Sequence, residues 1–363
     1  MSEDLREFID NVAKESHLRV EADLGGGFVR LRTEEAERRQ ARHDIRSSED
    51  ALIELLRNSR DAGARTIFVA LSRSGAERRI VVVDDGCGVP PALHEAVFEA
   101  RVTSKLDTVH TDLWGVHGRG MALFSIRLNA EEAFIAASDV GKGCALVVRT
   151  DTGRVPEKTD QSSMPLLSYD DDRNLIVRGP RNLNRTIVEF ALAEQDACTV
   201  YAGSPVEVAA AIYAFGLATT TSAARAFAHD PRDLPAVKRL CAAADPEELA
   251  SLAASIGLDM SERSARRIMD GEIRPAPSAL EALRIDDPAR ASAASRAHRA
   301  SKDPLRDARG LKLSPEDAAA FKERLSAAWG DLAAAYYLDP HAEPRVVVRG
   351  DAVHVTFPAR KLR

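Results

Sequence analysis

The sequence has few of the features that mark disulfide-stabilised, metal-binding or membrane-spanning proteins. It has four cysteines, which are widely spaced and form no CxxC pair: Cys87, Cys144, Cys198 and Cys241. We therefore expect neither a zinc site nor a disulfide framework. No apolar run approaches the roughly 18 residues of a membrane-spanning helix. The N-terminus is charged from Glu3 onward and lacks an apolar stretch of signal-peptide length. These absences predict a cytoplasmic protein with no membrane partner.

An excess of charge of one sign is also lacking. The chain has 50 lysines and arginines against 56 aspartates and glutamates, a formal net charge of -6. This balance excludes a uniformly basic coat for nucleic acid, although it leaves room for local basic patches. With 363 residues, of which 45% are hydrophobic, the chain is long enough for two domains and a small C-terminal element.

The spacing of apolar residues in the first half predicts alternating helices and strands. Helix is expected over 35–62, with capping chemistry at Ser47 and a stop at Gly63, and again over 118–128. The expected strands are 66–72, 79–84, 133–138, 145–149, 174–177 and 186–190. This order predicts an α+β fold, a two-layer sandwich in which helices cover one face of a mixed sheet.

The second half changes to alanine-rich helix. The predicted organisation is an N-terminal arm, an α+β domain, a mainly helical domain, a basic linker, and a C-terminal helix with a β-hairpin. The boundaries are 1–34, 35–195, 196–287, 288–312 and 313–363. The linker is basic, because its acidic residues are only Asp303 and Asp307. Its seven basic residues are Arg290, Arg296, Arg299, Lys302, Arg306, Arg309 and Lys312.

Four short motifs follow one another within the predicted α+β domain. They are Glu-Leu-Leu-Arg-Asn-Ser-Arg-Asp-Ala-Gly-Ala at 54–64, Asp-Asp-Gly-Cys-Gly at 84–88, Thr-Ser-Lys at 103–105 and Gly-Val-His-Gly-Arg-Gly at 115–120. As a set they resemble the GHKL family of gyrase, heat-shock chaperones, histidine kinases and MutL. They are most similar in style to MutL and the B subunit of type II topoisomerases. The resemblance covers roughly residues 35–192 and implies a Bergerat-type fold that binds ATP with Mg²⁺.

The first two motifs supply the expected base, metal ligand and adenine contacts. Glu54 and Asn58 are four residues apart and so share one face of a helix. The resemblance implies that Glu54 polarises the attacking water and that the Asn58 carbonyl binds magnesium. It also implies that Asp84 reads the adenine amino group. The other expected nucleotide contacts are Asp61, Gly86, Gly88 and Thr186, whose hydroxyl would support Asp84.

The last two motifs supply the expected phosphate contacts. By resemblance, Lys105 places an ammonium beside the terminal phosphate and counts with Glu54 as catalytic, while Thr103 and Ser104 lie next to it. Glycines that open a helix expose amides to an anion. The expected phosphate loop therefore contains Gly115, Gly118, Arg119 and Gly120.

A basic segment in the second half resembles a helix-turn-helix unit. Gly257 lies in its turn, Ser261 caps the second helix, and that helix carries Arg263, Arg266 and Arg267. These arginines and the basic linker are candidates for contact with duplex DNA. We expect an ATPase whose nucleotide state switches a helical C-terminal half that binds DNA or a protein partner. Related proteins often dimerise with ATP, so residues 1–34 are a candidate strap in a nucleotide-dependent homodimer.

Two other functions stay open from the sequence. The chain could be a histidine-kinase-like phosphotransfer enzyme, with His43 in its arginine-rich helix as the acceptor. It could instead be a DNA-binding regulator that senses ATP without turnover. A histidine kinase usually carries a two-helix dimerisation hairpin before the nucleotide domain, and too few residues precede the motifs here for one. This favours hydrolysis over phosphotransfer.

Overall fold

A computed structural model describes most of the chain, and it divides into two compact units, Met1–Asp286 and Asp287–Arg363. The described residues are 20–33, 35–104, 110–112, 115–117, 120–158, 160–170, 174–221, 230–281, 283, 285–286, 315–349 and 352–361. Within them, no helix is both long enough and apolar enough to cross a membrane. Each unit is described by itself.

The first unit is built on a mixed sheet with the order β12-β3-β4-β9-β8. Its strands are β3 (Thr66–Ser74), β4 (Glu77–Asp84), β8 (Glu132–Ser138), β9 (Cys144–Asp151) and β12 (Thr199–Gly203). β12 runs parallel to β3, and the other neighbours are antiparallel. The expected strands at 66–72, 79–84, 133–138 and 145–149 are confirmed, and so is the α+β class.

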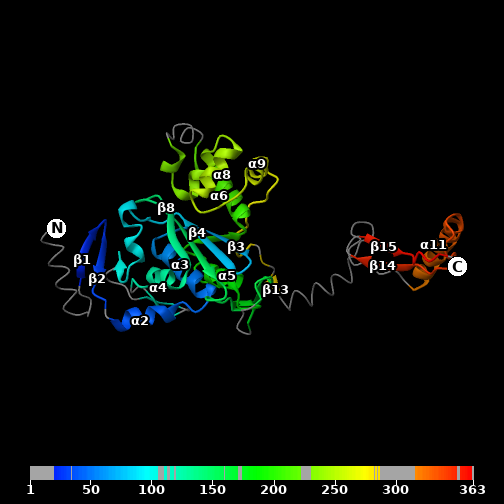
Figure 1. Cartoon of the computed structure of the whole chain (residues 1–363), viewed down its shortest axis with the longest axis horizontal. Coiled ribbons are helices and arrows are strands. Elements are labelled where there is room, and N and C mark those ends of the chain that lie inside the picture. Colours follow the sequence, from blue (N-terminus) through cyan, green and yellow to red (C-terminus); the bar gives the residue numbers. More distant parts are fainter. Residues whose placement is uncertain are drawn as a thin grey trace. The chain divides into compact units, whose positions relative to one another are not determined.

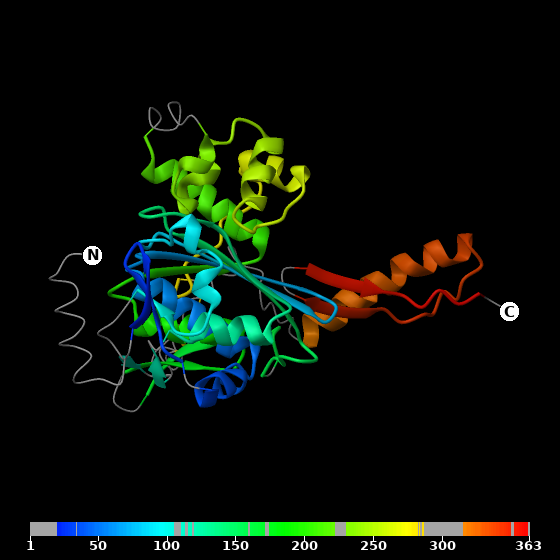
Figure 2. The same cartoon turned by 60° about the vertical axis from the view of Figure 1, so that its left-hand side comes forward.

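Helices pack on both faces of this sheet (Figures 1 and 2). Alternate residues of β4 face opposite ways, because side chains alternate along a strand. Ile80 and Val82 join the apolar cluster with α3 (Ser48–Asp61) and α5 (Leu183–Ala193). Val81 and Val83 join the cluster formed with the helices that follow residue 204. The expected helix-covered face is present, and the later helical segment covers the second face as an additional layer.

Among the described residues, the main elements of the second-face layer are three helices and a 3-10 segment. These are α6 (Pro205–Thr219), η4 (Ala236–Ala242), α8 (Pro246–Ala254) and α9 (Glu262–Met269). α6 begins at a capping box, in which the Ser204 side chain accepts from the Glu207 amide and the Glu207 carboxylate accepts from the Ser204 amide. Gly257, between α8 and α9, lies against Val147 and Val81 of the sheet. The segment from α8 to α9, whose sequence resembles a helix-turn-helix unit, is therefore held to the sheet by its turn.

Smaller elements complete the first unit. They are β1 (Val20–Gly25), β2 (Phe28–Leu31), α2 (Glu35–Asp44), η1 (Pro91–Leu93), η2 (Ala96–Phe98), β5 (Val102–Thr103), β6 (His110–Asp112), β7 (Gly115–His117), α4 (Ala122–Asn129), β10 (Leu166–Tyr169), β11 (Leu175–Arg178), η3 (Pro231–Asp233) and β13 (Ile285–Asp286). β1 and β2 form a hairpin, and β2 pairs with β5. The described part of the expected arm thus lies beside the Thr-Ser-Lys motif of its own chain.

The strand expected over 186–190 is wrong, because these residues lie in helix α5. Asn182 caps this helix by accepting a hydrogen bond from the Arg185 amide, and Leu183, Ile187 and Phe190 are buried on one side. β-Branched residues at 186–188 favour a strand locally, but packing against α3 decides otherwise. The strand that completes the sheet is β12, which was not expected.

The second unit has one helix and one hairpin among its described residues. α11 (Pro315–Ala335) precedes β14 (Arg345–Arg349) and β15 (Ala352–Thr356), which pair in the expected antiparallel register. Trp329 of α11 stacks on Phe357, with ring centroids 4.6 Å apart, and its Nε1 donates to the Asp339 carbonyl. The basic linker lies outside the described residues.

Candidate functional site

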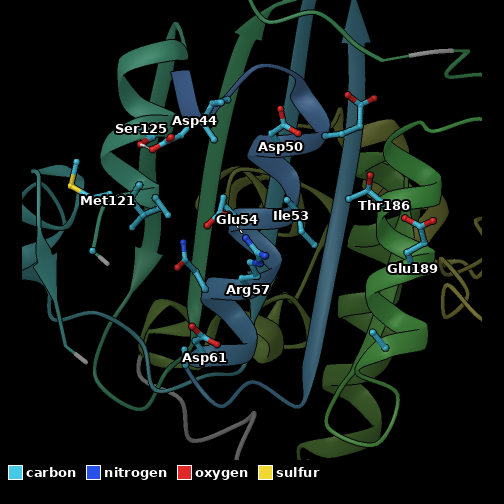
Figure 3. Close-up of a pocket in the computed structure, with 18 of the residues that line it drawn as sticks. Asp44, Asp50, Ile53, Glu54, Arg57, Asp61, Met121, Ser125, Thr186 and Glu189 are labelled. Atoms are coloured by element: carbon cyan, nitrogen blue, oxygen red, sulfur yellow. Dashed lines mark hydrogen bonds and ion pairs between the residues drawn. The ribbon is translucent and has the colours of Figure 1, made fainter. Parts of the chain in front are cut away.

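A cleft of about 1560 Å³ lies over helix α3 in the first unit. Figure 3 shows α3 crossing the middle of this cleft, with Met121 and Ser125 on one side and Thr186 and Glu189 of α5 on the other. The cleft is lined by polar side chains of α3, by residues at the start of α4, and by the loop after β4. Described residues of all four sequence motifs therefore line this one cleft.

Helix α3 presents an apolar face to the sheet and a polar row to the cleft. Ser47 caps it by accepting from the Asp50 amide, and the helix ends before Gly63, whose φ is +74°. Leu52, Leu55 and Leu56 are buried in the core below. Glu54, Asn58 and Asp61 line the cleft. The sequence-predicted sharing of one helix face by these polar residues is what brings them together.

Asp84 ends β4, and its side chain is buried and not among the residues that line the cleft. Its Oδ2 accepts a hydrogen bond of 2.8 Å from Ser59 Oγ, and its Oδ1 accepts from the amides of Gly86 and Cys144. Burial raises the pKa of Asp84 to about 6, although these hydrogen bonds lower it in part. Near neutral pH the carboxylate is an acceptor held at a fixed position.

Two glycines bring the backbone close to other segments at the cleft. Gly88 has φ +72°, and a Cβ there would lie 2.0 Å from the carbonyl oxygen of Asp139. Gly120 has φ +67°, and its Cβ would lie 3.1 Å from the carbonyl of Val102. Both glycines line the cleft, and a side chain at either would displace a neighbouring strand or loop.

The residues that line the cleft suit a Mg²⁺ ion bound mainly by nucleotide phosphate and water, with Asn58 as its protein ligand. The Nδ2 atom of Asn58 is buried without a hydrogen-bond partner among the described residues. No hydrogen bond from Nδ2 to the described residues therefore fixes the orientation of the Asn58 amide. A rotation of the amide can exchange the positions of its oxygen and nitrogen. The described part of the chain has no group of three or more histidines, cysteines or carboxylates arranged for a metal. Mg²⁺ beside a nucleotide typically takes one or two protein ligands, with phosphate and water completing the shell.

The other predicted site residues fall into three groups. Thr103 and Ser104 line the cleft from β5 and the position after it. Gly115 begins β7, where it pairs with Asp112. Lys105, Gly118 and Arg119 lie outside the described residues, so their predicted phosphate contacts stay predictions.

Thr186 lines the cleft, but it does so from a helix. Its Oγ1 donates to the Asn182 carbonyl within α5, whereas the hydroxyl that donates to Asp84 belongs to Ser59. Ser59 was missed by the sequence reasoning, although it lies inside the first motif directly after Asn58. Ser59 is not on the helix face shared by Glu54, Asn58 and Asp61. Its contact with Asp84 joins residues 25 apart in the chain, so local spacing gives no signal for it.

Two further side chains have clear places. Asp85 accepts hydrogen bonds from the amides of Arg65 and Thr66, at 2.7 and 2.8 Å, and so fixes the start of β3. Arg57 was not singled out from the sequence. It lines the cleft and donates to Glu54.

Comparison with known proteins agrees with this geometry. A family model described as histidine kinase-, DNA gyrase B-, and HSP90-like ATPase matches residues 45–168. The chain is similar to the DNA mismatch repair protein MutL of Desulforudis audaxviator, with 43% identity over 76 residues, 20% of this chain and 13% of that protein. The Thermus aquaticus MutL is 43% identical over 81 residues, 22% of this chain and 15% of that protein. The Rhizorhabdus wittichii MutL is 47% identical over 77 residues, 21% of this chain and 13% of that protein.

These matches span only 13% to 15% of the relatives' own length, so they concern the domain around the cleft. The matched residues 45–168 contain α3, four of the five strands of the sheet and all four motifs. Residues 45–168 are therefore an ATP-binding domain of the histidine kinase-, DNA gyrase B- and HSP90-like ATPase family, the GHKL family, and resemble MutL.

Proposed function

We propose that the chain hydrolyses ATP bound with Mg²⁺ in the α3 cleft. The observation that carries this proposal is the shared face of Glu54 and Asn58, one helical turn apart, on the part of α3 that lines the cleft. Asp84, buried at the end of β4 and hydrogen-bonded to Ser59 of the same helix, would accept from the adenine amino group.

Each residue has a role that its environment supports. Glu54 takes the proton of an attacking water, for which its carboxylate must be ionised and held in place. Asn58 would hold Mg²⁺ through its side-chain oxygen, and the ion would supply positive charge to the phosphates. Ser59 and the Gly86 amide keep Asp84 oriented. Gly120 lets the backbone come close to a bound polyanion.

The test is steady-state ATP hydrolysis by the whole chain and by Glu54→Ala, with nucleotide binding measured in both. We expect turnover in the wild type and a fall of at least about tenfold in the variant, while binding survives. If ATP binds and neither protein turns it over, the hydrolase proposal is wrong. The site then either senses ATP or transfers its phosphate to another group.

We propose further that nucleotide binding is transmitted to the helical layer on the second face of the sheet. Two backbone hydrogen bonds support this route. The Gly141 amide donates to the Cys87 carbonyl at 2.8 Å, and the Ala236 amide of η4 donates to the Lys142 carbonyl at 3.0 Å. The loop at 139–143 thus joins the adenine side of the cleft to the helical layer.

A nucleotide-dependent homodimer is tested by mass in solution with and without a non-hydrolysable ATP analogue.

Duplex DNA is the partner that we propose for the helical layer. Arg263, Arg266 and Arg267 are exposed on α9, although Arg266 pairs with Glu262 and Arg267 with Glu272. Replacing all three arginines by glutamine should weaken binding and flatten its salt dependence, because each lost phosphate contact removes about one unit from the salt slope. Arg154→Gln removes one exposed arginine from a turn elsewhere and is the control. Equal binding by the triple variant and the wild type would exclude this face.

Phosphotransfer is the second candidate function, because His43 lies in the last turn of α2 and lines the same cleft. Labelled phosphate retained on the chain and lost in His43→Ala would support it. Turnover without any retained label would instead favour hydrolysis.

A further inference from the structure

Arg57 is a nearly buried charged residue in the middle of α3, the helix that lines the cleft. Its side chain is only 4% exposed, and its Nη1 donates to Glu54 Oε1 at 2.5 Å, while the Glu54 side chain is 20% exposed. Figure 3 shows the two side chains joined on the cleft side of α3. The proposed base therefore shares an ion pair with a nearly buried guanidinium.

Stability alone is a weak reason for this pair. Removing two charges from water costs several kcal/mol, and well-packed apolar residues at such sites are often as stable or more so. The neighbours Leu55 and Leu56 are buried apolar side chains of the same helix. An apolar residue at 57 would extend that core without the cost of burying a charge. The position of Arg57 on the cleft, against the base, points to a role in the site.

A base next to a polyphosphate meets two physical problems. The phosphate charge opposes ionisation of the carboxylate, and a freely rotating carboxylate is seldom aimed at the water. A guanidinium hydrogen-bonded to one carboxylate oxygen addresses both, because it offsets the charge and restricts rotation of the side chain. A carboxylate held in one orientation can then present an oxygen to the water.

Building on the proposed function, we propose that Arg57 is a positioning residue, which holds Glu54 ionised and oriented for activation of the attacking water. Arg57 acts through Glu54 and not as a phosphate ligand. Replacing it should therefore lower the rate of the chemical step and leave ATP affinity nearly unchanged.

The experiment is a double-mutant cycle on the full chain, with single-turnover hydrolysis of labelled ATP and a separate binding titration. The variants are Arg57→Gln, Glu54→Gln and the double variant. We expect Arg57→Gln to slow hydrolysis about 10- to 100-fold and to change the Kd for ATP by less than about threefold. In the Glu54→Gln background the same substitution should have no further effect, because the group it acts through is gone.

Two further variants separate this role from a structural one. Arg57→Lys keeps the charge without the planar fork and should lose less rate than Arg57→Gln. Arg78→Gln is the matched control, because Arg78 on β4 has a 9% exposed side chain and pairs with Glu157, also at 2.5 Å. It is not among the residues that line the cleft. It should destabilise the protein comparably and leave the rate of the folded enzyme unchanged.

The outcomes distinguish this inference from the proposed function. If the wild type hydrolyses ATP and Glu54→Gln slows turnover at least about tenfold to a rate that is still measurable, but Arg57→Gln retains the wild-type rate, the positioning role is wrong and the hydrolase proposal stands. An equal loss of rate in both Glu54 backgrounds, or a tenfold or larger loss of ATP affinity, would make Arg57 a ligand of the nucleotide and overturn the inference. A wild type that binds ATP without turnover overturns both proposals.

Discussion

The hydroxyl of Ser59 donates to the buried carboxylate of Asp84 at 2.8 Å, which joins the polar face of α3 to the end of β4. The two residues come from different motifs. Asp84 is the proposed acceptor for adenine, and Ser59 holds its carboxylate in place. The bond engages Oδ2, while Oδ1 accepts from the amides of Gly86 and Cys144, so both carboxylate oxygens are held. Orientation of Asp84 therefore depends on α3 as well as on the loop that follows β4.

Ser59→Ala should weaken ATP binding and destabilise the protein. A hydrogen bond to a charged group contributes about 1.5–3 kcal/mol, and its loss leaves a buried carboxylate with fewer donors. We expect a loss of about tenfold or more in affinity, measured by titration with ATP, and a lower melting temperature. Thr186→Ala is the control, because that hydroxyl donates within its own helix. A larger effect on ATP affinity at Thr186 than at Ser59 would contradict this assignment.

Asp84 should give the folded protein a pH-dependent free energy of unfolding. The folded-state pKa is about 6 against an ordinary value of 3.8, so between these values the folded protein holds a proton that the unfolded chain has released. Stability relative to Asp84→Asn should therefore fall as pH rises through this window, by up to about 3 kcal/mol. Urea unfolding of both proteins at several pH values measures this difference. Parallel pH profiles would mean that Asp84 titrates normally.

The local parts of the site could be predicted from the sequence. Glu54, Asn58 and Asp61 share a helix face because of their spacing alone, and Ser47 caps the same helix. Thr186 shows the limit of this reasoning. Its β-branched neighbours favour a strand, but the Asn182 cap and the burial of Ile187 and Phe190 favour the helix that the structure has. Tertiary packing overrides local propensity there.

The sequence carries a signal for the second helical layer. Residues 80–83 are an unbroken apolar run, Ile-Val-Val-Val. A strand covered on one face alternates apolar and polar residues, whereas a strand buried on both faces is apolar throughout. This run therefore favours two covered faces, as Val81 and Val83 show by packing under the later helices. The contact between Ser59 and Asp84 had no such local signal.

Asn58→Ala should remove most of the magnesium dependence of ATP binding. The Asn58 amide is the cleft group whose Nδ2 is buried and unpartnered among the described residues, and it is the proposed protein ligand. We expect wild-type affinity to fall about tenfold when Mg²⁺ is chelated, and the variant to change little. Titrations of ATP with Mg²⁺ and with EDTA measure this difference. An unchanged magnesium response in the variant would place the ion on other groups.

Gly257→Ala should weaken the packing of the segment from α8 to α9 on the sheet. A Cβ at Gly257 would lie 2.4 Å from Val147 Cγ2, and the residue has φ +82°, so the variant meets both backbone strain and a clash within the core. Arg79 also holds this turn, by donating to the Gly257 carbonyl at 3.0 Å and pairing with Asp259. We expect a loss of about 3 kcal/mol in the free energy of unfolding. Gly271→Ala has a similar φ of +73° but open space around its Cβ, so it should cost only about 1 kcal/mol from the left-handed backbone. Urea unfolding of the two variants compares them directly, and equal losses would mean that the turn is not pressed against the sheet.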